Sequence, residues 1–376
     1  MNATIPNPDL AVGAGNKAYW TQADNRRWGW HNFHRIARYT TSLRAARVLV
    51  LEERPEPGIA SAQAVRHLTS LKWFSAMVVL KGRNILYERY APDFGPDQPH
   101  SLQSITKTMM NLIVGPLVER GQLDLNQTVG HYIPEIGSGY ANAKIQQVLD
   151  MNVVNDYSED FADPKATYYR HEEAMGLRLP PDPLREETEQ RFLAKLTSSD
   201  TTNHSGHLQY KDANTDVLGW VVERATRISA RMFLADIVDA AGLEDALYIT
   251  TDRVGFPFLA GGACMSARDL ARYFSLFVRL IHGPGDQCIG SKAFVERSLA
   301  SGVVLPPPYR NIRYRNHLLV SGDWVGHSGW GGQFAMANLR TGVVGVFFSV
   351  LEDEHAVDRG YTCSIIDMLQ AISETA

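Results

Sequence analysis

The chain has 376 residues, of which 44% are hydrophobic and 21% charged, and a formal net charge of −4. This length exceeds the size at which one hydrophobic core stops growing, so we expect one large composite domain or two domains. The charge balance gives no basic footprint for nucleic acid or for an anionic membrane, and no apolar run reaches the roughly 20 residues that span a bilayer. Three cysteines are too few for a disulfide framework and are expected to be reduced and mostly buried.

The N-terminal part of the chain is polar, and residues 1–25 are predicted to form an arm. It shows no basic segment followed by an apolar one, so a cytoplasmic location is expected. Further on, Trp28, Trp30, Phe33 and Ile36 recur at near-helical spacing. The β-rich segments FSAMVVL and ILYERYA then flank the turn-like tetrad KGRN, which predicts a hairpin.

After this hairpin the pattern becomes helical. Residues 104–120 form an apolar helical face that stops at Gly121, and Pro116 is expected to kink this helix near its end. Residues 122–260 read as helices and loops, including the long helical run 216–238. An amphipathic helix follows over residues 266–280.

The C-terminal part returns to strands, with a last helix beginning near Asp358. Strands at both ends of the chain can pair into one antiparallel sheet, which predicts an α+β fold. We therefore expect a discontinuous α/β sheet lobe of residues 26–105 and 262–376, and a mostly helical lobe of residues 106–261. A cleft between such lobes is a usual place for a small-molecule site.

Ser104 and Lys107 open the predicted helix, and their spacing places both side chains on one helical face. A serine hydroxyl needs an adjacent base to act as a nucleophile, and a neutral lysine can supply one. Backbone N–H groups at a helix start can also stabilise an oxyanion. The alternative interpretation is a helix-capping serine followed by a solvated lysine.

Two later segments carry further candidates. Tyr210 precedes a strong helical segment, and its phenol can relay a proton; otherwise it is a half-buried packing residue. The sequence Gly326-His327-Ser328-Gly329 lies where a strand is expected, and glycine there often marks a close backbone approach to a ligand. An exposed N–H in this segment would be a second oxyanion donor; the alternative is a glycine-rich turn with a surface histidine.

The order of Ser-x-x-Lys, Tyr and His-Ser-Gly resembles the serine β-lactamase-like superfamily, whose motifs are S-x-x-K, Y-x-N and [KH]-[ST]-G. The phrases NRRWGWHNF, QQVLDM, DYSEDFADP, QYKDANTDVLGWVVERAT and SARDLAR resemble the 6-aminohexanoate-dimer (nylon-oligomer) hydrolase group. The resemblance extends over about residues 26–370. It implies a β-lactamase/transpeptidase-like fold, in which an antiparallel sheet flanked by helices adjoins a mostly helical lobe.

The resemblance also implies a role for each matched residue. Ser104 would be acylated, Lys107 would take its proton, and Tyr210 would pass a proton to the leaving group. The backbone N–H groups of Ser104 and Trp330 would form the oxyanion hole. His327 would line the cleft where other members carry lysine.

Several residues depart from the pattern of the family. Asp212 stands where lactamases carry the asparagine of Y-x-N, and no lysine follows Lys292, so the clamp for the β-lactam carboxylate is missing. Phe161 replaces a tyrosine that contacts the scissile amide in the nylon-oligomer group, and Ala260 replaces a polar residue. Glu172 keeps a carboxylate near the place where that group holds the substrate amine.

These observations predict a serine hydrolase that cleaves small carboxylic esters or linear amides through an acyl-enzyme on Ser104. The alternative is a penicillin-recognising binding module, or a weak β-lactamase or D-peptidase, in which deacylation is slow. No metal or cofactor is expected. The expected partners are a small-molecule ester or amide substrate and, in a homodimer, a second copy of the chain; nucleic acid and membrane are not expected. The absence of G-x-S-x-G argues against an α/β-hydrolase.

Overall fold

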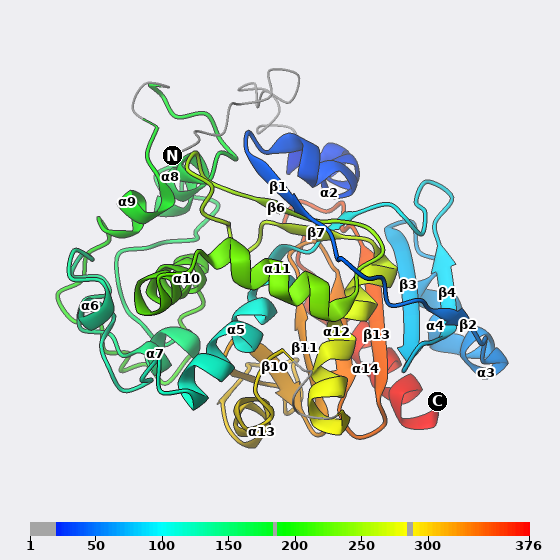
Figure 1. The fold of residues 1–376 in the computed structure, drawn as a ribbon. Coiled ribbons are helices and arrows are strands. Elements are labelled where there is room, and N and C mark those ends of the chain that lie inside the picture. Colours follow the sequence, from blue (N-terminus) through cyan, green and yellow to red (C-terminus); the bar gives the residue numbers. More distant parts are fainter. Residues whose placement is uncertain (1–19, 183–185, 284–288) are drawn as a thin grey trace.

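The computed structural model describes residues 20–182, 186–283 and 289–376 (Figure 1). Helix α2 (Ala23–Ile36) begins within the segment predicted as an arm, whose residues 1–19 lie outside the described part. Cys264 is buried, Cys363 is partly exposed, and both are free thiols; Cys288 lies outside the described residues. No helix in the described ranges is both long and apolar enough to cross a lipid bilayer.

A nine-stranded sheet forms the frame of the molecule. Its strands run in the order β2-β4-β3-β13-β12-β11-β10-β9-β8, and all neighbours are antiparallel except the parallel pair β2–β4. Strands from the N-terminal and C-terminal parts of the chain thus share one sheet, as the sequence predicts. The α+β fold class is confirmed. The strands are β2 (Glu52–Glu53), β3 (Phe74–Lys81), β4 (Asn84–Tyr90), β8 (Val303–Val304), β9 (Arg313–Arg315), β10 (Leu318–Ser321), β11 (Trp324–Ser328), β12 (Phe334–Asn338) and β13 (Val343–Ser349).

The hairpin predicted from FSAMVVL and ILYERYA is present as β3 and β4, which close where Lys81 pairs with Asn84. Strand β3 is an interior strand, the third from one edge of the sheet, and its residues are buried along the whole strand except at Lys81. A strand with both faces covered reads as a continuous apolar run, which is why FSAMVVL does not alternate. Helices α12 (Ala267–His282) and α14 (Arg359–Thr375) pack on the sheet, and Figure 1 shows α12 in front of it and α14 behind.

A second, four-stranded sheet was not predicted. Its order is β1-β6-β7-β5, and it consists of β1 (Thr40–Leu43), β6 (Leu247–Thr250), β7 (Ala263–Met265) and β5 (His100–Ser101). Strands of two to four residues are too short to show a periodicity in the sequence. This sheet positions the site, because β5 leads directly into the 3₁₀ turn η2 (Gln103–Lys107) that carries Ser104.

Most of the remaining helices gather beside the sheets, on one side of the molecule in Figure 1. The long run predicted over residues 216–238 is two helices and not one, since Arg227 takes a left-handed conformation (φ 61°) that ends the first of them. The helices are α3 (Pro57–Ser61), α4 (Gln63–Leu68), α5 (Thr108–Glu119), α6 (Val129–Tyr132), α7 (Ile145–Leu149), α8 (Thr167–Ala174), α9 (Glu189–Leu193), α10 (Asp212–Thr226), α11 (Ala230–Ala241) and α13 (Lys292–Ala300).

The division into a sheet lobe (26–105 and 262–376) and a helical lobe (106–261) stays a prediction. The strands of the nine-stranded sheet do come from residues 52–90 and 303–349, while β6 lies within the segment assigned to the helical lobe.

Candidate active site

The sequence predicts Ser104 in the first turn of an α-helix, but this residue lies in the 3₁₀ turn η2. Helix α5 begins four residues later, at Thr108. The preceding residue, Gln103, has φ +48°, a left-handed conformation that is uncommon for a side chain of this size and tends to occur at functional sites. In a 3₁₀ turn, side chains three residues apart lie directly above each other. This geometry brings Lys107 against Ser104.

Lys107 is fully buried, so it is not a solvated helix residue. Its Nζ donates to Ser104 Oγ at 2.9 Å, to Asp212 Oδ1 at 2.6 Å and to the Ala260 carbonyl oxygen at 2.6 Å. A lysine ammonium has three donors, and these three acceptors use all of them. The Asp212 carboxylate balances the buried charge, and Nζ is held within proton-transfer distance of Ser104.

Tyr210 lies on the other side of this pair, with Lys107 Nζ 5.0 Å from the centre of its ring. Its hydroxyl is buried and makes no hydrogen bond of good geometry within the described part of the chain. Burial, followed by the charge of Asp212, raises the pKa of Tyr210 well above its usual range, while the nearby Ser104 side chain acts in the opposite direction. The phenol is therefore protonated and free to move its proton to a bound substrate.

His327 lies in β11 and is buried. Its Nδ1 lies 2.6 Å from the Ser328 carbonyl oxygen, which can only accept, so the ring carries its hydrogen on Nδ1 and presents a lone pair on Nε2. Burial lowers the pKa of His327 to about 3. The residue that replaces the family's lysine is thus a neutral acceptor, and it lies beside the ring of Tyr210.

Two backbone N–H groups are available at the site. Within the described ranges, neither the Ser104 N–H nor the Trp330 N–H has an acceptor in the protein. The N–H of Gly329 is not available, since it donates to the Gln333 carbonyl at 2.8 Å. Glycine is needed at this position because a Cβ would stand 2.5 Å from the Leu102 carbonyl oxygen. This close approach holds the end of β11 against η2.

Trp330 is fixed by several contacts. Its carbonyl oxygen accepts from Trp30 Nε1 at 3.0 Å, and its own Nε1 donates to the His355 carbonyl at 3.1 Å. Phe161 stacks on its ring with the ring centres 5.8 Å apart and 22° between the planes. Phe161 is 50% exposed, so part of its ring faces solvent.

Glu172 does not face the cavity at Ser104. It is buried, its carboxylate lies 3.2 Å from Arg178 Nε, and it hydrogen-bonds the phenol of Tyr168. Its charge is already balanced inside the protein. The amine-binding role that the family resemblance implies for Glu172 stays a prediction.

Glu159 is a neighbour of the site that the sequence analysis missed. Its Oε1 accepts the backbone N–H of Asp212 at 2.5 Å, at the first residue of α10. Burial, and then the charge of Asp212, raise the pKa of Glu159 to about 8. The sequence around a glutamate in a loop does not predict such a contact, because the contact depends on how the loop folds back onto α10.

A cavity of about 230 Å³ opens at Ser104 and brings together most of the predicted site residues. Lys107 and Asp212 lie behind it, and Phe161 and Glu172 are not part of its wall. Most of its other walls are apolar. It is lined by Ser104, Leu208, Tyr210, Leu305, Tyr309, Tyr314, Leu319, His327, Ser328, Gly329, Trp330, Gly332, Leu351, Ala356, Val357, Asp358 and Thr362.

The fold and this arrangement of side chains define a hydrolase of the β-lactamase-like superfamily. The Beta-lactamase family model matches residues 63–361, and the chain belongs to that family. A 6-aminohexanoate-dimer hydrolase of Paenarthrobacter ureafaciens is 34% identical to it over 312 residues, which cover 78% of this chain and 75% of that protein.

Solved structures share the fold at lower sequence identity. A Bacillus anthracis protein with the provisional name 6-aminohexanoate-dimer hydrolase has a TM-score of 0.80 at 20% identity, with 99% of this chain and 98% of that chain covered. EstCE1, a hydrolase with promiscuous acyltransferase activity, has a TM-score of 0.62 at 15% identity, with 84% of this chain and 100% of that chain covered. The predicted superfamily and its fold are confirmed.

Proposed function

We propose that the chain hydrolyses small carboxylic esters or linear amides through an acyl-enzyme on Ser104. The observation that carries this proposal is the 2.9 Å contact between Ser104 Oγ and the fully buried Nζ of Lys107. A serine at the mouth of a cavity with a base in hydrogen-bond contact is the arrangement that nucleophilic catalysis requires.

Lys107 must first become an amine, and the proton that its ammonium gives up passes to Asp212 Oδ1, which lies 2.6 Å from Nζ. In the proposed first step, Ser104 Oγ then attacks the substrate carbonyl while the Lys107 amine takes the hydroxyl proton. The bond from Oγ to the carbonyl carbon forms as the carbonyl oxygen becomes an oxyanion, which the N–H groups of Ser104 and Trp330 stabilise. When the intermediate collapses, Tyr210 gives its proton to the departing oxygen or nitrogen and regains one from Lys107. A water molecule then reverses these steps and releases the acid.

The cavity favours a neutral, apolar group on the substrate. Apolar side chains make up much of its wall, and none of its described lining residues is lysine or arginine. A substrate carboxylate would therefore meet no lysine or arginine among these residues. His327 is neutral, and the negative charge of Asp358 would repel the carboxylate. This argues against the usual anionic β-lactams and supports small neutral esters or amides.

Esters are expected to be better substrates than matched linear amides. An amide nitrogen must be protonated before it departs, and the hydroxyl that contacts the amide in the nylon-oligomer group is absent at Phe161. A lost hydrogen bond to a transition state costs on the order of 1–3 kcal/mol, or roughly ten- to a hundredfold in rate. Phe161→Tyr should therefore raise kcat/KM for the amide more than for the ester. Equal kcat/KM for the matched pair in the wild-type enzyme would contradict this prediction.

Burst kinetics with p-nitrophenyl butyrate separate the enzyme from a slow-deacylating binding module. The enzyme should release p-nitrophenol over many turnovers, whereas a penicillin-recognising binder stops after one equivalent. Ser104→Ala is the control and should show neither the burst nor the turnover. Release that ends at one equivalent would replace the proposed hydrolase with the binding module.

A further inference from the structure

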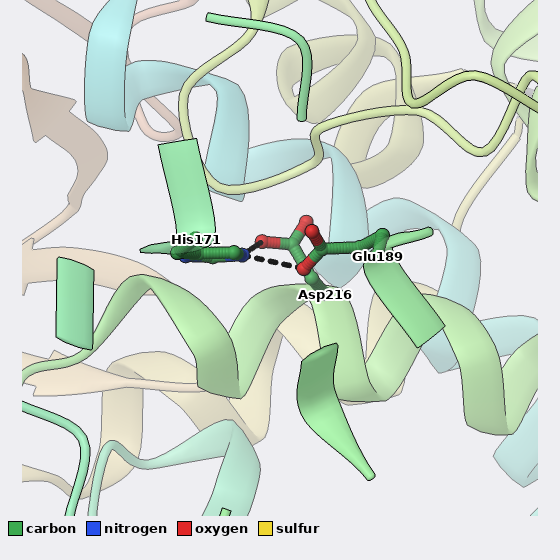
Figure 2. A group of neighbouring side chains, drawn as sticks. All are labelled: His171, Glu189 and Asp216. Carbon is green, nitrogen blue, oxygen red and sulfur yellow. Dashed lines mark hydrogen bonds and ion pairs between the residues drawn. The ribbon is translucent and has the colours of Figure 1, made fainter. Parts of the chain in front are cut away.

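A second cluster of titratable side chains lies in the helical part of the molecule and takes no part in the mechanism above. His171 of α8, Glu189 of α9 and Asp216 of α10 meet there with their side chains fully buried (Figure 2). His171 Nε2 is in hydrogen-bond contact with Glu189 and lies 3.6 Å from Asp216 Oδ2. On its other edge, His171 Nδ1 lies 2.8 Å from the hydroxyl of Tyr157.

This set of donors is one that a divalent cation uses, but its geometry fits shared protons better. His171 Nε2 is in hydrogen-bond contact with Glu189 Oε1, so a hydrogen lies between these two atoms. Burial also raises the pKa of Glu189 and of Asp216 well above the usual range, so these carboxyl groups retain protons readily.

The cluster is connected to the catalytic lysine through one peptide segment. Asp216 Oδ1 accepts the backbone N–H of Leu259 at 2.8 Å and that of Ala260 at 3.2 Å. The carbonyl oxygen of Ala260 in turn accepts from Lys107 Nζ at 2.6 Å. Since all of these groups are buried, water does not compete for the contacts.

Helix α10 thus holds Lys107 by two routes. Asp212, at the start of the helix, contacts Nζ directly, and Asp216, one turn later on the same face, holds the Leu259–Ala260 segment that carries the second acceptor. His171, from α8, lies 3.6 Å from Asp216 Oδ2, and Glu189, from α9, contacts His171. The second route to Nζ therefore runs through the carboxylate of Asp216.

We propose that Asp216 is a positioning residue that fixes Lys107 for acyl transfer through the Leu259–Ala260 peptide. This inference rests on the Ser104–Lys107 chemistry proposed above. Displacing a catalytic group by about 1 Å can cost on the order of 10²-fold in rate. Asp216 itself contacts no substrate, so its loss should affect the chemical step and leave substrate binding nearly unchanged.

The test compares Asp216→Ala with Asp216→Asn. The alanine variant should lower kcat for p-nitrophenyl butyrate by about 10- to 100-fold with KM within roughly twofold, since the chemical step alone is affected. The asparagine variant should recover most of kcat, because its amide oxygen can still accept both N–H groups. If the alanine variant does not fold, Asp216→Ser takes its place, since its short hydroxyl cannot hold both N–H groups.

Asp269→Ala is the matched control. Asp269 is also fully buried and also accepts two backbone N–H groups, from Glu244 and Asp245, each at 2.8 Å. Its contacts do not include Lys107. This variant should lose thermal stability but keep the kcat of the folded enzyme.

Four outcomes would overturn the inference, and the last of them comes from a labelling assay. One is an Asp216→Ala enzyme that melts earlier but keeps its kcat, and another is an asparagine variant as slow as the alanine variant. The third is one equivalent of zinc in purified wild-type protein.

The rate of phosphonylation of Ser104 by a fluorophosphonate separates this inference from the proposed function. Wild-type protein that is not labelled at Ser104 refutes the function, whereas equal labelling rates in wild type and Asp216→Ala refute only the positioning role.

Discussion

Lys107→Ala should lower kcat for p-nitrophenyl butyrate by at least about 10²-fold, the usual contribution of a proton-transfer group. The fully buried Nζ of Lys107 is in hydrogen-bond contact with Ser104 Oγ at 2.9 Å, which is the position that a proton acceptor for the hydroxyl must occupy. Steady-state kinetics of the folded variant measure this effect. Near-normal turnover would remove Lys107 from the mechanism.

The same change should also destabilise the fold. It leaves the carboxylate of Asp212 without the cation 2.6 Å away, and breaking a buried ion pair costs about 3–5 kcal/mol of unfolding free energy. Lys211→Ala is the matched control, because Lys211 is also buried and donates to Asn155 at 2.5 Å, but does not contact Ser104. It should lose stability while the folded protein keeps most of its kcat.

Tyr210→Phe should lower kcat by a similar factor, at least about 10²-fold, without lowering stability. Its hydroxyl makes no hydrogen bond of good geometry within the described part of the protein, so its removal should change the unfolding free energy by less than about 1 kcal/mol. The loss should be larger for an amide than for a matched ester, because the amide nitrogen needs the proton of Tyr210 to depart.

The control for this substitution is Tyr273→Phe. The hydroxyl of Tyr273 is buried and lies 2.9 Å from Thr108 Oγ1, away from the cavity at Ser104. This variant should lose some stability and keep its activity, which is the reverse of the pattern expected for Tyr210→Phe. A Tyr210→Phe enzyme with full activity would contradict the assigned role.

The contact between Ser104 and Lys107 was predictable because it is local. Residues three apart on any helical turn share a face, so the pair meets in a 3₁₀ turn as it would in an α-helix. The hairpin β3–β4 was predictable for the same reason, since its strands are long and its turn is short. Tyr210 came from motif order alone, because no local pattern brings it beside residues a hundred positions away.

The rest of the site depends on backbone contacts and on packing, which the types of the side chains do not reveal. The Ala260 carbonyl holds Lys107, and a backbone acceptor is the same whatever the side chain is. The N–H of Gly329 is already bonded to Gln333, so the glycine is required by its close approach to Leu102 and not by oxyanion binding. Glu172 keeps the expected residue type, but it packs against Arg178 instead of facing the cavity.

The most direct test of the account is the mass of the protein after reaction with a fluorophosphonate. We expect one adduct per chain, located by peptide mapping on Ser104, and no adduct in Ser104→Ala. Labelling of another residue, or labelling that persists undiminished in Ser104→Ala, would contradict the claim that Ser104 is the nucleophile.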